Sequence, residues 1–308
     1  MIEIKSLTKT FGDKVAVDNL TFTVQDGEIM GFLGPNGAGK STTMNILTGY
    51  LSATSGTAVI NGADIFENPK KAKQNIGFLP EQPPLYPDMT VMEYLKFVYE
   101  LKGAKEPRRY HLEEICEMTG ILSVKNRVIK NLSKGYRQRV GIAQALVGDP
   151  KVLIFDEPTV GLDPNQIIEI RELIKNLGKK HTVILSTHIL SEVQAVCDRI
   201  VIINKGKIVA DSPTDELLTN TAGVVKYRVK LAADEKTALR LVQGVEGVLS
   251  ATPVKSEEEN LVELILDTNP DIEIRHGLFK ALAEKGVSLM GLESVSLTLE
   301  DIFTSLTA

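Results

Sequence analysis

Short apolar runs alternate with helical patterns over most of the chain. Residues 2–7 and 20–34 alternate apolar and polar positions around a turn at Gly27, which predicts β-strands. Residues 152–156 and 182–187 are continuous apolar or β-branched runs, and a helical pattern at 164–178 separates them. Such runs between helices predict a parallel sheet that is covered on both faces.

A helical region interrupts this α/β pattern. A hairpin turn at Asn61-Gly62 and a stiff, proline-rich loop come first. Thr90 and Glu93 then form a capping box in front of an apolar stripe with helical spacing. Residues ~85–148 are therefore predicted to be a helical subdomain inserted into the α/β core.

The pattern changes again from about residue 224. The remaining segments predict strand, helix, strand, strand, helix, strand, with a charged, exposed tip at 256–260 and a short final helix near 298–306. This order is typical of a ferredoxin-like α+β unit. We expect domains at 1–220 and 224–308 and find no pattern of catalytic residues in the second.

Composition narrows the function. The chain is 43% hydrophobic and 24% charged, as in ordinary soluble proteins. Its net charge of −5 argues against a nucleic-acid surface, which needs Lys and Arg to neutralise phosphates. No apolar run approaches the roughly 20 residues of a membrane-spanning helix, so we expect any action at a membrane to go through a partner.

Residues 34–42, GPNGAGKST, match the P-loop pattern G-x-x-x-x-G-K-[ST] between a predicted strand and a predicted helix. In this pattern the backbone N–H groups surround the β-phosphate, Lys40 reaches the β and γ oxygens, and the Ser41 hydroxyl binds Mg²⁺. The alternative, a glycine-rich turn by chance, does not explain the flanking strand and helix. The candidate nucleotide-binding residues are Gly34, Pro35, Asn36, Gly37, Ala38, Gly39, Lys40, Ser41 and Thr42.

Further candidates for this site lie at predicted strand ends. Asp156 and Glu157 end the run 152–156, at the sheet edge where open parallel sheets bind ligands. Asp156 suits a metal contact, and Glu157 suits polarising a water in line with the γ-phosphate. His188 ends the next strand and is either a γ-phosphate contact or an ordinary histidine, while Phe11 either stacks on adenine or belongs to the core.

A second anion site follows from residues 131–144, NLSKGYRQRVGIAQ. Ser133 predicts a helix N-cap, and Gly135 leaves backbone N–H groups accessible at the helix start. Asp163, in front of Pro164, predicts another N-cap.

Taken together, residues ~2–220 resemble the ATP-binding subunit of an ABC transporter, of the exporter type with a small C-terminal accessory domain. The P-loop corresponds to Walker A, residues 152–156 with Glu157 to Walker B, Asp163 to the D-loop, and His188 to the switch histidine. The fragment that resembles the family's L-S-G-G-Q signature comprises Leu132, Ser133, Lys134, Gly135 and Tyr136.

The resemblance implies how two anion sites work in one chain. In this family two subunits dimerise head to tail, and the signature helix of one points at the γ-phosphate held by the P-loop of the other. ATP, with Mg²⁺, closes the dimer, and hydrolysis opens it. The implied partners are a second ATPase subunit, identical or different, and an integral-membrane permease. The implied location is cytoplasmic, on the inner face of the cell membrane.

Two positions depart from the family pattern. The signature has Lys134 where glycine is common and Tyr136 where glutamine is common. The position of the Q-loop glutamine, counted from Gly77, is occupied by Glu81, with Gln82 next to it. Because a carboxylate oxygen can replace an amide oxygen near Mg²⁺, we expect Glu81 to take this role.

The alternative function is a soluble ABC ATPase that acts as a mechanical clamp on ribosomes or DNA. ABC ATPases that act on ribosomes carry two nucleotide-binding domains in one chain, whereas this sequence has a single Walker A motif. ABC ATPases that act on DNA carry a long coiled coil between Walker A and the signature. In this chain that interval, residues 43–131, contains no sustained heptads. A nucleotide kinase would leave the signature helix and His188 unexplained. We therefore predict a transporter ATPase.

Overall fold

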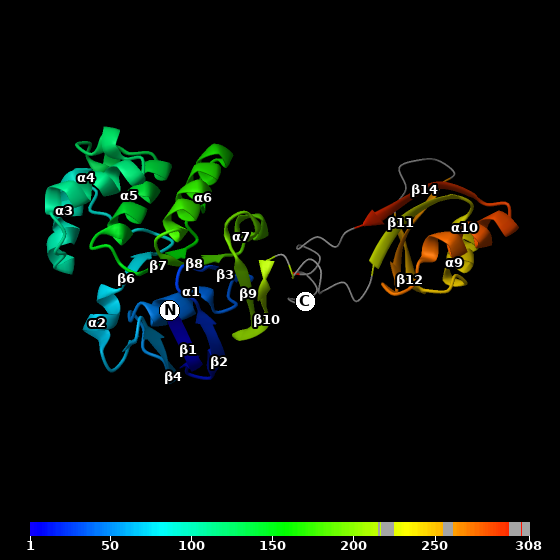
Figure 1. The fold of residues 1–308 in the computed structure, drawn as a ribbon, viewed down its shortest axis with the longest axis horizontal. Coiled ribbons are helices and arrows are strands. Elements are labelled where there is room, and N and C mark those ends of the chain that lie inside the picture. The colour runs from blue at the N-terminus through cyan, green and yellow to red at the C-terminus, as the bar shows by residue number, and fades with distance from the viewer. Residues whose placement is uncertain (215, 217–224, 255–260, 296–302, 304–308) are drawn as a thin grey trace. The chain divides into compact units, whose positions relative to one another are not determined.

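The computed structural model describes residues 1–214, 216, 225–254, 261–295 and 303, which fall into two compact units (Figure 1). The strands of the first unit are β1 (Ile2–Phe11), β2 (Lys14–Val24), β3 (Ile29–Leu33), β4 (Ser55–Ile60), β5 (Ala63–Asp64), β6 (Ile76–Leu79), β7 (Val152–Asp156), β8 (Thr182–Thr187), β9 (Arg199–Asn204) and β10 (Lys207–Pro213). Its helices are α1 (Lys40–Leu47), α2 (Pro69–Gln74), α3 (Val91–Lys102), α4 (Arg108–Met118), α5 (Lys134–Leu146), α6 (Pro164–Gly178) and α7 (Leu190–Val196), with 3₁₀ turns at Leu122–Val124 and Ile129–Asn131.

Two sheets form the centre of the first unit. One is four-stranded, in the order β2-β1-β4-β5, and its β4–β5 hairpin turns at Asn61-Gly62 as predicted. The other is six-stranded, in the order β10-β9-β3-β8-β7-β6, and all its pairs are parallel except β9–β10. The main core lies between the sheets, where Phe22 of β2 stacks on Phe32 of β3 with ring centroids 5.6 Å apart. The predicted parallel α/β core is confirmed.

The helices α3, α4 and α5 group together beside the larger sheet (Figure 1). The capping box is present, since Thr90 and Glu93 exchange hydrogen bonds at the start of α3. At the other end of α3, the Lys102 ammonium donates to the carbonyl oxygens of Gln144, Ala145 and Val147. This contact gives a charged donor to carbonyls in the last turn of α5 and to the Val147 carbonyl directly after it, so it ties α3 to α5.

The second unit is a small α+β fold. Its elements are β11 (Val225–Ala232), α9 (Glu235–Gln243), β12 (Val248–Val254), β13 (Val262–Thr268), α10 (Ile274–Glu284) and β14 (Ser288–Val295). They form an antiparallel sheet in the order β12-β13-β11-β14, and its buried side chains pack with those of α9 and α10. The predicted tip at 256–260, and the predicted final helix apart from residue 303, lie outside the described residues.

The described helices include none that is both long and apolar enough to cross a membrane.

Candidate functional site

Parallel strands bring the predicted phosphate-site residues to one edge of the larger sheet. In the register, Leu33 of β3 pairs with Thr187 of β8, and Ser186 of β8 pairs with Asp156 of β7. The loops that leave these strands carry the P-loop, Glu157 and His188. Residues distant in the sequence therefore meet at the carboxyl ends of the strands, where such sheets bind ligands.

The P-loop ends at the first turn of α1, which no side chain caps. Gly39 has a left-handed φ of 112°, and a β-carbon there would lie 2.6 Å from the Ala16 carbonyl oxygen. A larger residue at this position would therefore push the loop away from β2. The first N–H groups of α1 are available to an anion, and the helix dipole favours negative charge there.

Lys40 and Glu157 are buried side by side. The Lys40 ammonium donates to the Gly34 carbonyl at 2.8 Å and lies 3.6 Å from Glu157 Oε1. His188 is half-exposed, and its Nδ1 donates to the Glu157 carboxylate at 2.9 Å. The carboxylate predicted to polarise water thus lies between a cation and an imidazole.

Asp156 lies next to the P-loop serine. Its carboxylate accepts hydrogen bonds from Ser186, at 2.7 Å, and from Ser41. Burial raises the pKa of Asp156, although both hydroxyl groups oppose the shift. The side chains of Ser41, Asp156 and Glu81 offer hydroxyl and carboxylate oxygens, which are the ligands that Mg²⁺ prefers, so the residues fit this ion.

Most of the predicted nucleotide-site residues line one pocket of about 460 Å³. The predicted residues that line it are Phe11, Asn36, Gly37, Gly39, Lys40, Ser41, Thr42, Glu81, Glu157 and His188. The remaining predicted P-loop residues, Gly34, Pro35 and Ala38, do not line this pocket, and Asp156 is buried and accepts a hydrogen bond from Ser41. Phe11 is 49% exposed, and the Lys9 ammonium lies 5.0 Å from its ring centroid, so Phe11 is not a core aromatic.

The signature residues line a different pocket, of about 550 Å³. Ser133 caps α5 by accepting from the Tyr136 N–H, and Asp163 caps α6 by accepting from the Gln166 N–H at 3.0 Å. Ser133, Gly135, Tyr136 and Asp163 line this pocket, while Leu132 is buried. A β-carbon at Gly135 would lie 2.6 Å from the end of the Gln166 side chain, so a larger residue here would make that amide move away from the start of α5. The Lys134 ammonium lies beside Gly161, in the loop before Asp163.

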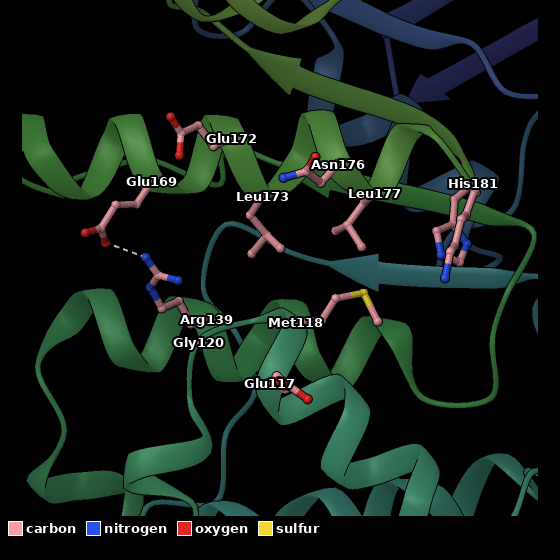
Figure 2. Close-up of a pocket in the computed structure, with 11 residues that line it drawn as sticks. Glu117, Met118, Gly120, Arg139, Glu169, Glu172, Leu173, Asn176, Leu177 and His181 are labelled. Atoms are coloured by element: carbon pink, nitrogen blue, oxygen red, sulfur yellow. Dashed lines mark hydrogen bonds and ion pairs between the residues drawn. The ribbon is translucent and has the colours of Figure 1, made fainter.

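Arg139 fixes the orientation of the signature helix. Figure 2 shows its guanidinium reaching from α5 to Glu169 on α6, and it also donates to the Thr119 carbonyl at the end of α4 at 3.0 Å. The pocket drawn there, of about 530 Å³, is lined by residues of α4, α5 and α6 and of the turn before β8. Arg139 thus joins three helices next to Ser133.

A buried acidic residue near the predicted phosphate site belongs to none of the predicted sequence motifs. Glu192, in the first turn of α7, accepts hydrogen bonds from Thr159 and Thr187. A signal for it exists, because Glu192 and Val196 have i, i+4 spacing and therefore share the apolar face of a helix.

Comparison with known proteins identifies the family. The family model "ABC transporter" matches residues 17–160. Over 306 residues the chain is 35% identical to an uncharacterized ABC transporter ATP-binding protein, YhcH of Bacillus subtilis, covering 89% of this chain and 98% of that one. It is 32% identical to the bacitracin transport ATP-binding protein BcrA of Bacillus licheniformis, covering 99% and 97%. The chain belongs to the ATP-binding proteins of ABC transporters.

Solved structures agree with this assignment. The dimeric structure of MJ0796, a bacterial ABC transporter cassette, is 29% identical, with a TM-score of 0.64 over 70% of this chain and 99% of that one. A post-hydrolysis state of the same cassette, bound to ADP and Pi, is also similar, with a TM-score of 0.63. The chain is thus an ATP-binding and hydrolysing subunit that powers a transporter, and the comparisons give no support to a clamp on ribosomes or DNA.

The two adjacent Q-loop candidates face different places in this ABC ATPase. Glu81 lines the pocket that holds the predicted P-loop residues, whereas Gln82 lines a separate groove near Tyr50. We expect Glu81→Ala to lower the ATP hydrolysis rate on the order of tenfold, as loss of a group near a metal does, and Glu81→Gln to lower it less. Gln82→Ala is the matched control and should stay within about twofold of the wild type. Loss of activity in Gln82→Ala with full activity in Glu81→Ala would reverse the assignment.

Proposed function

We propose that two subunits of this kind close head to tail around ATP, so that each nucleotide touches the P-loop of one subunit and the signature helix of the other. Two observations support this. Lys40, Glu157 and His188 share one pocket, whereas Ser133 caps a helix that lines another. A similar cassette is also dimeric in its solved structure. The separation of the two half-sites carries the proposal, because the P-loop residues and the signature residues line different pockets of the same chain.

In the proposed complex the P-loop, residues 34–42, holds the α- and β-phosphates with its backbone N–H groups. The Lys40 ammonium leaves the Gly34 carbonyl and Glu157 for the β and γ oxygens, since phosphate oxygens carry more charge than a carbonyl. Adenine stacks on the face of Phe11 that Lys9 does not cover.

Mg²⁺ is the metal that we propose for this site. Ser41 and Asp156 would hold it, with Glu81 contacting it directly or through water. When bound, the ion neutralises charge on the β and γ oxygens.

Glu157 is the residue that we propose takes a proton from the attacking water. It is the carboxylate that lines the pocket directly after Asp156, and release from Lys40 would leave its oxygens free to accept that proton. The His188 Nδ1–H bond holds the carboxylate in place, and the other ring nitrogen can reach the γ-phosphate.

The signature residues act on the partner's nucleotide in this proposal. The Ser133 hydroxyl and the N–H groups at the start of α5, near Gly135, would bind the γ-phosphate that the other subunit holds. The buried Leu132 anchors this turn, and Tyr136 lines the same pocket. The Lys134 ammonium, beside Gly161, would add positive charge close to the D-loop Asp163.

A groove next to the phosphate site suits the membrane partner. The groove, of about 630 Å³, lies between the end of α1 and the proline-rich loop and is lined by Tyr50, Phe78 and Pro84 among others. Tyr50 is 84% exposed. We infer that an integral-membrane permease inserts a segment here and so holds the ATPase at the cytoplasmic face of the membrane. The similarity to a bacitracin transport ATP-binding protein supports a role in transport.

Glu157→Gln tests the proposed hydrolysis step. The amide cannot take a proton from water, so we expect ATP to bind with wild-type affinity while turnover falls about a hundredfold or more. Phosphate release and binding of a fluorescent ATP analogue measure the two effects. Lys40→Ala is the contrasting variant and should lose binding itself. Rapid hydrolysis by Glu157→Gln would remove Glu157 as the base.

Affinity purification from detergent-solubilised native membranes tests the proposed partner. The tagged wild type should recover a polytopic membrane protein in near-equal amount. Tyr50→Asp should lose this protein, because it puts a charge into the groove. The control Tyr110→Asp changes another exposed tyrosine, in α4 and outside the groove, and should retain the membrane protein. Equal recovery by both variants, or recovery of ribosomes or DNA instead, would contradict the proposal.

A further inference from the structure

Glu192 is an almost completely buried acidic side chain, only 1% exposed, behind the phosphate pocket. Thr159 Oγ1 donates to its Oε1, and Thr187 Oγ1 donates to its Oε2 at 2.8 Å. A carboxylate is unfavourable in the interior unless hydrogen bonds compensate it, and here each oxygen has a hydroxyl donor.

The two threonines belong to the two loops that carry the proposed reacting groups. Thr159 is two residues after Glu157, in the loop from β7 to α6, and Thr187 ends β8 directly before His188. The helix α7 packs against β3 and β8 (Figure 1), so Glu192 reaches both loops from one rigid element. One carboxylate thereby links the loop of the base to the loop of the histidine.

Glu192 also decides where the Thr187 hydroxyl hydrogen points. This oxygen lies 2.8 Å from Glu192 Oε2 and 3.5 Å from Glu157 Oε2, and it accepts a hydrogen bond from the Ile189 N–H. Its single hydrogen goes to the nearer carboxylate. Glu157 Oε2 accepts from His188 Nδ1 at 2.9 Å, and without the Thr187 hydrogen its remaining lone pair can accept a hydrogen bond from water.

The backbone at Glu157 needs such support. Its φ is +49°, in the left-handed region that residues with a β-carbon rarely adopt. The Glu157 N–H donates to the Ser186 carbonyl at 2.8 Å, which fixes one side of this turn. The Thr159–Glu192 hydrogen bond fixes the other side, two residues further along.

We propose that Glu192 is a positioning residue for ATP hydrolysis, which aligns Glu157 and His188 by binding Thr159 and Thr187 from behind. This inference rests on the proposed role of Glu157 as the base. It concerns the alignment of that base and leaves the contacts of the P-loop with nucleotide unchanged.

The test measures steady-state hydrolysis and nucleotide binding by the full-length protein. In Glu192→Gln one oxygen becomes an NH₂ group, so one threonine hydroxyl must accept rather than donate and turns its hydrogen elsewhere. We expect kcat to fall on the order of tenfold or more, with KM for ATP within about twofold of the wild type. Glu172→Gln, the same change at an exposed residue of α6 that Figure 2 labels, should leave both kcat and KM unchanged.

A second set of variants separates positioning from simple folding. Thr159→Val replaces the hydroxyl by a methyl group of similar volume and should lower kcat as Glu192→Gln does. Thr159→Ser keeps the hydroxyl and should have a kcat close to that of the wild type. The double variant Glu192→Gln/Thr159→Val should lose no more than the worse single variant, because both break one contact. Thermal unfolding of each variant confirms that the protein is folded.

Two outcomes would overturn the inference. One is a kcat of Glu192→Gln equal to that of the wild type. The other is a loss of kcat in the double variant that equals the product of the losses in the two single variants. If Glu157→Gln is inactive while Glu192→Gln is fully active, this inference alone fails. If Glu157→Gln itself hydrolyses ATP rapidly, the proposed base fails first.

Discussion

Parallel pairing of β3 with β8, and of β8 with β7, is the constraint on which the phosphate site depends. The register places Thr187 level with Leu33 and Ser186 level with Asp156. Since side chains alternate between the faces of a strand, a slip of one residue in β7 would turn Asp156 away from Ser186 and Ser41. The chemistry of the P-loop therefore depends on the packing of buried apolar strands several residues away.

Charge is concentrated in this site to an unusual degree for a protein interior. Lys40, Asp156 and Glu157 are each almost completely buried, and they balance one another through one ion pair and the hydroxyl groups of Ser186 and Ser41. Burial of unpaired charge is unfavourable, so each group keeps a partner. A nucleotide with its metal ion would exchange these partners for phosphate oxygens and a cation, which suits a site that must respond to ATP.

Much of this site could be predicted from the sequence, because its signals are local. The P-loop pattern, the apolar runs before Asp156 and His188, and the caps at Ser133 and Asp163 each occupy a few consecutive residues. Other features depend on packing between distant segments. Three features arise only after α6 and α7 pack on the sheet. They are the hydrogen bonds of Glu192 to two loops, the left-handed backbone of Glu157 and the position of the Lys134 ammonium beside Gly161.

The central claim is that two incomplete half-sites of different subunits make one working site, and mixing two inactive variants tests it most directly. Lys40→Ala damages the P-loop half, and Ser133→Arg damages the signature half while leaving its own P-loop intact. A mixed dimer would contain one intact site, formed by Lys40 of one subunit and Ser133 of the other. We predict single-turnover ATP hydrolysis by the mixture but not by either variant alone. Activity of the mixture no greater than the average of the two variants would contradict the shared site.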